Sequence, residues 1–174
     1  MIERKIIFVG GIHGVGKGTF CKNLVENFGY QHLTASEVLK WDEISDLKNK
    51  EVKNIASTQE RLISNLNQII KPNHKYLLDG HFTLLNSQGE PEKIEDVTFE
   101  EINPISIMLL TCDPETIIYR LNKRDNSAHS YNTLNKMQLM EIEHANHISQ
   151  KLKIPLFEVE NEDKQIIYNY LESI

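Results

Sequence analysis

The chain has 174 residues, of which 40% are apolar and 25% are charged, as expected of one globular domain with a core of its own. This composition excludes a largely disordered chain. The formal net charge of −6 argues against a nucleic-acid-binding or membrane-surface protein, because such partners favour clustered Lys and Arg. No apolar run reaches the length of a signal or membrane-spanning segment.

Cys21 and Cys112 are the two cysteines, and neither lies in a CxxC pair or beside a His/Cys ligand pattern. We therefore predict that both are reduced core residues. With no leader segment in view, the sequence predicts a cytoplasmic protein.

The first segment, KIIFVGGIHGVGKGTFCK (residues 5–22), has the pattern of a strand, a tight loop and a helix that Gly29 ends. Its loop matches G-x-x-x-x-G-K, in which glycines let successive amide groups converge on an anion at the positive end of the helix. Lys17 adds a point charge that can reach the β- and γ-phosphates. The segment predicts an ATP site formed by Gly11, His13, Gly14, Val15, Gly16, Lys17, Gly18 and Thr19.

The hydroxyl that usually follows the lysine comes one residue late, because Gly18 fills that position and Thr19 follows it. In this form the motif resembles the adenylate kinase branch of the nucleoside monophosphate kinases. The resemblance implies that Mg²⁺ is held mainly by phosphate oxygens and water, with Thr19 near the phosphates, and Mg²⁺ ordinarily keeps several waters.

Residues 30–33 form a short strand candidate, and residues 34–40 open a second helix in which Thr34 is the N-cap and Glu37 completes a capping box. The stretch TASEVLK resembles the STGDLLR-like segment that begins the acceptor site of the related kinases. Lys40 replaces the arginine of that segment. It is either an acceptor contact or a solvated charge on the helix face.

Residues 42–71 are first charged and then apolar at helical spacing, and Pro72 stops the pattern. In the related kinases this region is a helical insert that closes over the acceptor, which predicts an insert over residues 34–72. Arg61 lies within it and either points into the cleft or forms an outward salt bridge.

KYLLD, residues 75–79, is the next buried strand candidate and ends in Asp79. Ligands of open parallel sheets bind beyond the carboxyl ends of the strands, so Asp79 is the candidate carboxylate for hydrated Mg²⁺. The alternative is a turn aspartate before glycine. The sequence DGHF also resembles the DGFPR-like segment of adenylate kinases, which places His81 near the acceptor. A hairpin is predicted around residues 86–91.

Residues 104–111 are the most apolar stretch and predict a central parallel strand, after which Asp113 caps a helix. Arg120 and Arg124 are four residues apart and share one face of that helix. They either complement the helix dipole or, as the resemblance of RLNKRD to the lid entry of adenylate-kinase-like enzymes implies, contact the ATP base and phosphates respectively. Residues 125–133 are the predicted short lid.

Residues 134–152 predict a long amphipathic helix, on which we expect His144 and His147 to be partly exposed and not to bind a metal. Residues 154–159 are the last strand candidate. In the related kinases the following loop borders the adenine, which makes Asn161 a candidate contact.

Together these elements predict a single α/β domain over residues 1–174 with the P-loop NTPase fold, in which helices cover both faces of a five-stranded parallel sheet. The predicted activity is Mg²⁺-dependent phosphoryl transfer from ATP to a small acceptor, a nucleoside monophosphate in the first place. A nucleoside or hydroxyl-bearing metabolite is the second possibility, and an ATP-binding switch without kinase activity is the third.

We predict that the acceptor phosphate is not held as adenylate kinases hold AMP. That family uses arginines at positions where this chain has Lys40 and the run His81, Phe82, Thr83. A lysine does not reproduce the bidentate fork of an arginine. We therefore expect AMP to be a poor acceptor.

Overall fold

The computed structural model describes residues 5–40, 55–125 and 129–174. Its central sheet contains β1 (Lys5–Gly10), β2 (Gln31–Thr34), β3 (Lys75–Asp79), β6 (Ser106–Leu109) and β7 (Leu156–Glu158). The strand order is β2-β3-β1-β6-β7, and every neighbouring pair is parallel. The predicted five-stranded parallel sheet is confirmed.

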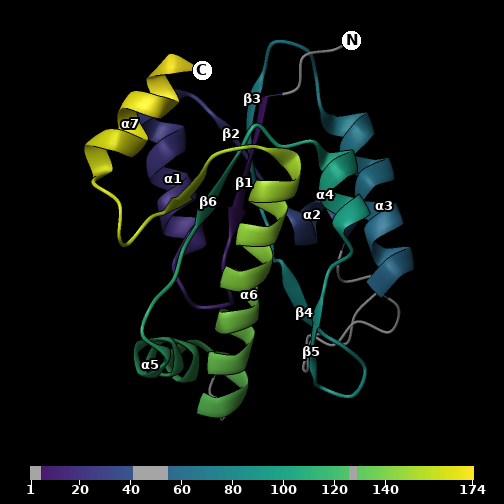
Figure 1. Ribbon diagram of the computed structural model, residues 1–174, viewed down its shortest axis with the longest axis vertical. Helices are drawn as coiled ribbons and strands as arrows, with labels where there is room; N and C mark the ends of the chain where they lie inside the picture. The colour runs from purple at the N-terminus through teal and green to yellow at the C-terminus, as the bar shows by residue number, and fades with distance from the viewer. Residues whose placement is uncertain (1–4, 41–54, 126–128) are drawn as a thin grey trace.

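Helices cover both faces of this sheet (Figure 1). One layer contains α1 (Lys17–Phe28), α5 (Pro114–Asp125) and α7 (Lys164–Ser173). The other contains α2 (Ala35–Leu39), α3 (Ile55–Ile69) and α4 (Asp96–Ile102). The long helix α6 (Tyr131–Leu152) contributes side chains to both cores.

Alternate side chains of β1 point to opposite faces of the sheet and pack into two separate cores. Ile6 and Phe8 pack with α3 and α4, whereas Ile7 and Val9 pack with α1 and α5. All four are almost fully buried. A continuous apolar strand is what a parallel sheet covered on both faces requires, and it fixes the end of β1 at the entrance to the glycine loop.

The predicted hairpin is present as a separate antiparallel pair, β4 (Thr83–Leu85) and β5 (Pro91–Lys93). Asn86 closes its turn, since its Oδ1 accepts hydrogen bonds from the backbone N–H groups of Gln88 and Glu90. The hairpin lies beside α6 (Figure 1).

Several local predictions are confirmed at the helix ends. Thr34 and Glu37 form the predicted capping box of α2. Gly29 ends α1 in the left-handed conformation with φ of 68°, and Asp113 Oδ2 accepts a hydrogen bond from the N–H of Thr116 at the start of α5.

The structure contains one helix that was not predicted and one histidine whose exposure was predicted wrongly. Helix α4 was not expected, because its seven residues are too few to show a convincing helical period. His144 is buried, with 4% of its surface exposed, and its Nε2 lies 2.6 Å from the carbonyl oxygen of Ile94. The expectation that it is partly exposed was wrong, because the hairpin and α4 cover this part of α6.

The predicted insert and lid are described only in part. Residues 41–54 of the insert and 126–128 of the lid lie outside the described residues, while 131–133 form the first turn of α6. Among the described helices, none is long and apolar enough to span a bilayer.

Candidate active site

The glycine loop joins β1 to α1, and its backbone takes angles that other residues rarely adopt. Gly11, Gly14 and Gly16 have φ values of 138°, 82° and 111°. A Cβ atom on Gly11 would lie 2.6 Å from the carbonyl oxygen of Leu110, whereas one on Gly16 or Gly18 would have no heavy atom within 4 Å. The loop is therefore packed on one side against the residue that follows β6 and against α5, and it is open on the other side.

The N-terminus of α1 faces this open side. Its N-cap is Gly16, and no side chain in the described part of the chain caps it by a hydrogen bond. Free N–H groups and the helix dipole make such a terminus an anion site, which fits the phosphates of ATP.

Lys17 is the cation of the loop and has 8% of its surface exposed. Its Nζ donates hydrogen bonds to the carbonyl oxygens of Gly11 (2.7 Å) and Ile12 (3.3 Å) and lies 3.8 Å from Oδ1 of Asp79. Burial lowers the pKa of Lys17, and the Asp79 carboxylate opposes this effect. Lys17 is thus held beside the open face of the loop.

Asp79 lies at the carboxyl end of β3, as predicted. Burial raises its pKa, while Lys17 and His32 act in the opposite direction. Nε2 of His32 lies 3.4 Å from Oδ2 of Asp79. Asp79 and Thr19 both face the same cavity and offer the oxygen ligands that Mg²⁺ prefers, so the residues present fit a hydrated Mg²⁺ ion.

The cavity has a volume of about 490 Å³ and two unlike halves. The P-loop half is mostly backbone and polar side chains, and the second half is formed by α2, α3, α4 and the hairpin. The lining residues of the first half are His13, Gly14, Gly16, Lys17, Gly18, Thr19, Asp79 and Arg124, and those of the second are Thr34, Ala35, Ser36, Leu39, Gln59, Leu62, Gly80, His81, Leu84, Ile94, Thr98, Phe99 and Ile102.

The two arginines of α5 reach the loop differently. Nη1 of Arg120 lies 3.3 Å from the carbonyl oxygens of both Gly14 and Val15, to which it donates hydrogen bonds. Arg124 lines the cavity. Both therefore turn toward the P-loop, but Arg120 braces the loop backbone and Arg124 faces the cavity.

Five other predicted site residues do not line the cavity. Gly11 and Val15 lie within the packed side of the loop. Lys40 is exposed and ends α2 with φ of 54°, Arg61 lies on α3, and the Asn161 side chain donates a hydrogen bond to Glu158. The cavity places Lys17, Asp79 and His81 together but leaves Lys40, Arg61 and Asn161 outside its lining.

Glu141 is a buried residue of this region that the sequence analysis missed. It has 1% of its surface exposed, and its Oε1 accepts hydrogen bonds from the N–H groups of Phe82 (2.9 Å) and Thr83 (3.0 Å) and from the Thr83 hydroxyl (3.1 Å). Burial raises its pKa to about 7. Glu141 anchors the segment after β3 to α6.

That anchored segment carries His81 to the P-loop. Nδ1 of His81 lies 3.8 Å from Oε1 of Glu141, and its ring contacts the ring of His13 with centroids 4.4 Å apart. The sequence did hold a signal for Glu141. It is an acidic residue on the apolar face of a helix, four residues after Met137 and four before Ala145.

A family model described as an AAA domain matches residues 10–138, well over half of the chain. The chain belongs to the AAA domain family. The range matched to the AAA domain begins at the end of β1 and includes the glycine loop, β3, the hairpin and α5, so it contains every residue that lines the cavity.

Among curated proteins, the chain is 31% identical over 128 residues to UMP-CMP kinase 3 of Oryza sativa subsp. japonica, covering 69% of this chain and 59% of the relative. It is 29% identical over 132 residues to adenylate kinase isoenzyme 1 of Cyprinus carpio, covering 70% and 65% respectively. The chain therefore matches less than two thirds of the length of these relatives.

Among solved structures, the chain resembles shikimate kinase from Acinetobacter baumannii in complex with shikimate, with a TM-score of 0.60 and 16% identity. The match covers 99% of this chain and 96% of that one. At this identity the likeness shows the fold, which is that of the P-loop NTPases.

Proposed function

We propose that this protein transfers the γ-phosphoryl group of ATP to a small acceptor, in the first place a nucleoside monophosphate, with the aid of Mg²⁺. The observation that carries the proposal is the single cavity that joins the P-loop half to a separate half lined by α2, α3 and α4. Two molecules can meet there. The curated relatives named UMP-CMP kinase and adenylate kinase support the same reading.

In this proposal the chain's own residues act mainly by position and charge. The N–H groups at the start of α1 and Lys17 bind the phosphates, and Arg124, which lines the same half of the cavity, balances their charge. Asp79 and Thr19 would hold Mg²⁺ through water, and the ion would neutralise charge on the transferring group. A phosphate acceptor is already nucleophilic, so no general base is required.

A second candidate keeps the chemistry but changes the acceptor to a nucleoside or another hydroxyl compound. It is favoured by the second half of the cavity, which we call the acceptor half. The described lining of this half offers apolar side chains, hydroxyls and the amide of Gln59. Within the described lining of the whole cavity, Lys17 and Arg124 are the Lys and Arg residues, and both lie in the P-loop half. A hydroxyl acceptor would need a base, for which Asp79 or His81 is placed.

The test is a screen of Mg²⁺ and ATP against nucleoside monophosphates, nucleosides and small hydroxyl metabolites, with each product identified by mass spectrometry. We expect ADP to form together with one phosphorylated acceptor. Hydrolysis of ATP with no acceptor phosphorylated would favour the switch and contradict both kinase candidates. The cytoplasmic location stays a prediction, and fractionation of cells that express the protein would test it.

A further inference from the structure

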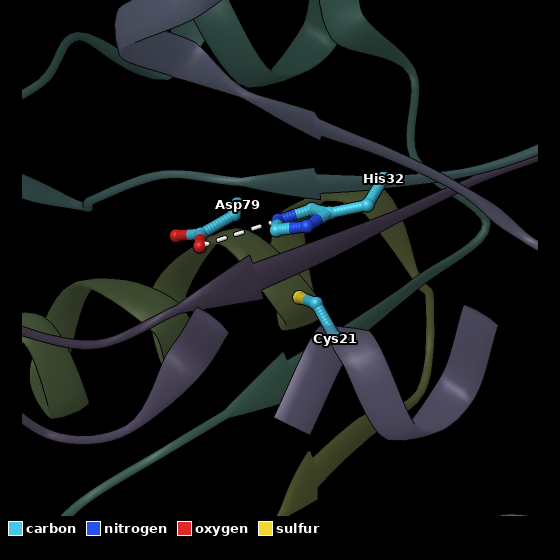
Figure 2. Close-up of side chains that lie close together, drawn as sticks. All are labelled: Cys21, His32 and Asp79. Atoms are coloured by element: carbon cyan, nitrogen blue, oxygen red, sulfur yellow. Dashed lines mark ion pairs between the residues drawn. The ribbon is translucent and has the colours of Figure 1, made fainter. Parts of the chain in front are cut away.

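Three side chains of different chemistry meet beneath the P-loop: Cys21 of α1, His32 of β2 and Asp79 of β3. Their ligand atoms all lie within 4.8 Å of one another (Figure 2). The fold brings them together because β2 and β3 are parallel neighbours, with Thr34 opposite Asp79. The side chains of His32 and Asp79 therefore point to the same face of the sheet, and α1 covers that face.

Two side chains of this cluster have polar atoms that are available to bind a ligand. Nε2 of His32 is buried and has no hydrogen-bond partner among the described residues, although it lies 3.4 Å from Oδ2 of Asp79. Cys21 is a free thiol with 0% of its surface exposed. Lys17 approaches the other carboxylate oxygen of Asp79, Oδ1. Oδ2 therefore remains directed toward His32 (Figure 2).

We propose that Cys21, His32 and Asp79 form a binding site for a single Zn²⁺ ion. A thiolate, an imidazole and a carboxylate are the three protein ligand types of Zn²⁺, whereas Mg²⁺ takes oxygen ligands and disfavours sulfur. Bond lengths of 2.0 to 2.3 Å in a tetrahedral site place neighbouring ligand atoms about 3.5 Å apart. Side-chain rotation would bring atoms now within 4.8 Å to that separation.

Charge also favours this occupant. The thiolate of Cys21 and the carboxylate of Asp79 together balance the charge of Zn²⁺, so the bound group is neutral in a buried place. Cysteine binds Zn²⁺ as the thiolate, so the Cys21 thiol gives up its proton on binding. Binding therefore breaks the S–H bond, forms the Zn–S bond and releases one proton to solvent.

Occupancy would change the active site, because Asp79 is also the candidate carboxylate for Mg²⁺. A Zn²⁺ ion on its Oδ2 would take this carboxylate from hydrated Mg²⁺. The site would thus act as an inhibitory metal switch. Its metal affinity is independent of whether the proposed phosphoryl transfer is correct.

The experiment is a titration of the whole protein with Co²⁺, a spectroscopic substitute for Zn²⁺, followed by displacement with Zn²⁺. We expect one equivalent of Co²⁺ to produce the near-ultraviolet charge-transfer band of a cobalt–thiolate bond. The Cys112→Ser variant, which removes the other cysteine, should keep the band, and Cys21→Ser should lose it. Wild type without the band, or Cys21→Ser with it, would overturn the proposal.

Folding is checked in the same samples by circular dichroism. His32→Gln provides a second route if Cys21→Ser does not fold, and we expect it to weaken Co²⁺ binding by about tenfold or more. Calorimetry of Zn²⁺ binding in buffers of different ionisation enthalpy should show proton release, of at least the proton lost by Cys21. Binding without proton release, or undiminished binding by His32→Gln, would contradict the assigned ligands.

Discussion

The two halves of the cavity are built by different means. The P-loop half is built mainly on one continuous segment, residues 13–19, in which Lys17 lies beside the space left by Gly16 and Gly18; Asp79 and Arg124 complete it. The acceptor half is assembled from side chains of α2, α3, α4 and the hairpin. An anion site needs only a local turn at a helix end, whereas a site for a particular acceptor needs many distant residues. In the proposed function, the nucleotide and the acceptor are therefore recognised by separable parts of the molecule.

The largest loss of activity should follow from Lys17→Ala, which removes the cation of the P-loop half. A lost charge-assisted contact of about 1.5 to 3 kcal/mol lowers the rate of phosphoryl transfer by about ten- to a hundredfold. Steady-state kinetics with ATP checks this. Lys22→Ala, which changes an exposed lysine of the same helix, is the matched control. A folded and fully active Lys17→Ala protein would remove the basis of the nucleotide half.

Glu141→Ala should cost stability, because it leaves the buried N–H groups of Phe82 and Thr83 without their acceptor. We expect unfolding in urea to require about 1 to 3 kcal/mol less free energy. Glu143→Gln on the exposed side of α6 should change stability little. Equal stability of Glu141→Ala and wild type would show that this anchor is unnecessary.

The same carboxyl group predicts a pH dependence. Its pKa is about 7 in the folded protein and near 4.5 when unfolded, so the folded state holds the proton over a range in which the unfolded state has lost it. Stability should therefore fall as pH rises from about 4.5 to 7, by at most about 3 kcal/mol. Glu141→Gln, which cannot titrate, should flatten this part of the stability profile. An unchanged slope would contradict the raised pKa.

Substitutions of the two arginines of α5 should have different effects, one on turnover and the other on ATP binding. Arg124 faces the cavity, so Arg124→Ala should lower kcat by about tenfold, the effect of losing about 1.4 kcal/mol in the transition state. Arg120 braces the loop backbone, so Arg120→Ala should mainly weaken ATP binding. Lys123→Ala is the control on the same helix. Negligible effects of both arginine changes would favour the helix-dipole explanation.

The smallest effect should appear at the boundary between the halves. His81 lines the cavity between Glu141 and His13, and His81→Ala should reduce transfer to the true acceptor severalfold while leaving ATP affinity unchanged. AMP should be a poor acceptor for the wild-type protein. The exposed His74 provides the control variant. Selective ADP formation from ATP and AMP, unaffected by His81→Ala, would indicate a plain adenylate kinase instead.

The features that could be predicted from the sequence are the local ones, and the features that could not be predicted depend on packing between distant segments. The strand, loop and helix around Lys17, the end of β3 at Asp79 and the turn of α5 toward the loop depend on local patterns, and the structure places them as expected. Glu141 and the burial of His144 depend on the hairpin and α4 packing against α6, which periodicity does not reveal. For Lys40 and Arg61 the sequence left both a cleft contact and a surface charge open, and neither residue is in the cavity lining.

The central claim is that a phosphoryl group passes from the P-loop half of the cavity to the acceptor half. Its most direct test follows γ-labelled ATP with Mg²⁺ and the acceptor that the product screen identifies, under single-turnover conditions, with Lys17→Ala as the control. The account predicts that the label leaves ATP and appears on the acceptor, at a rate about ten- to a hundredfold higher in the wild-type protein than in Lys17→Ala. Label that appears only in inorganic phosphate, with the acceptor unlabelled, would contradict it.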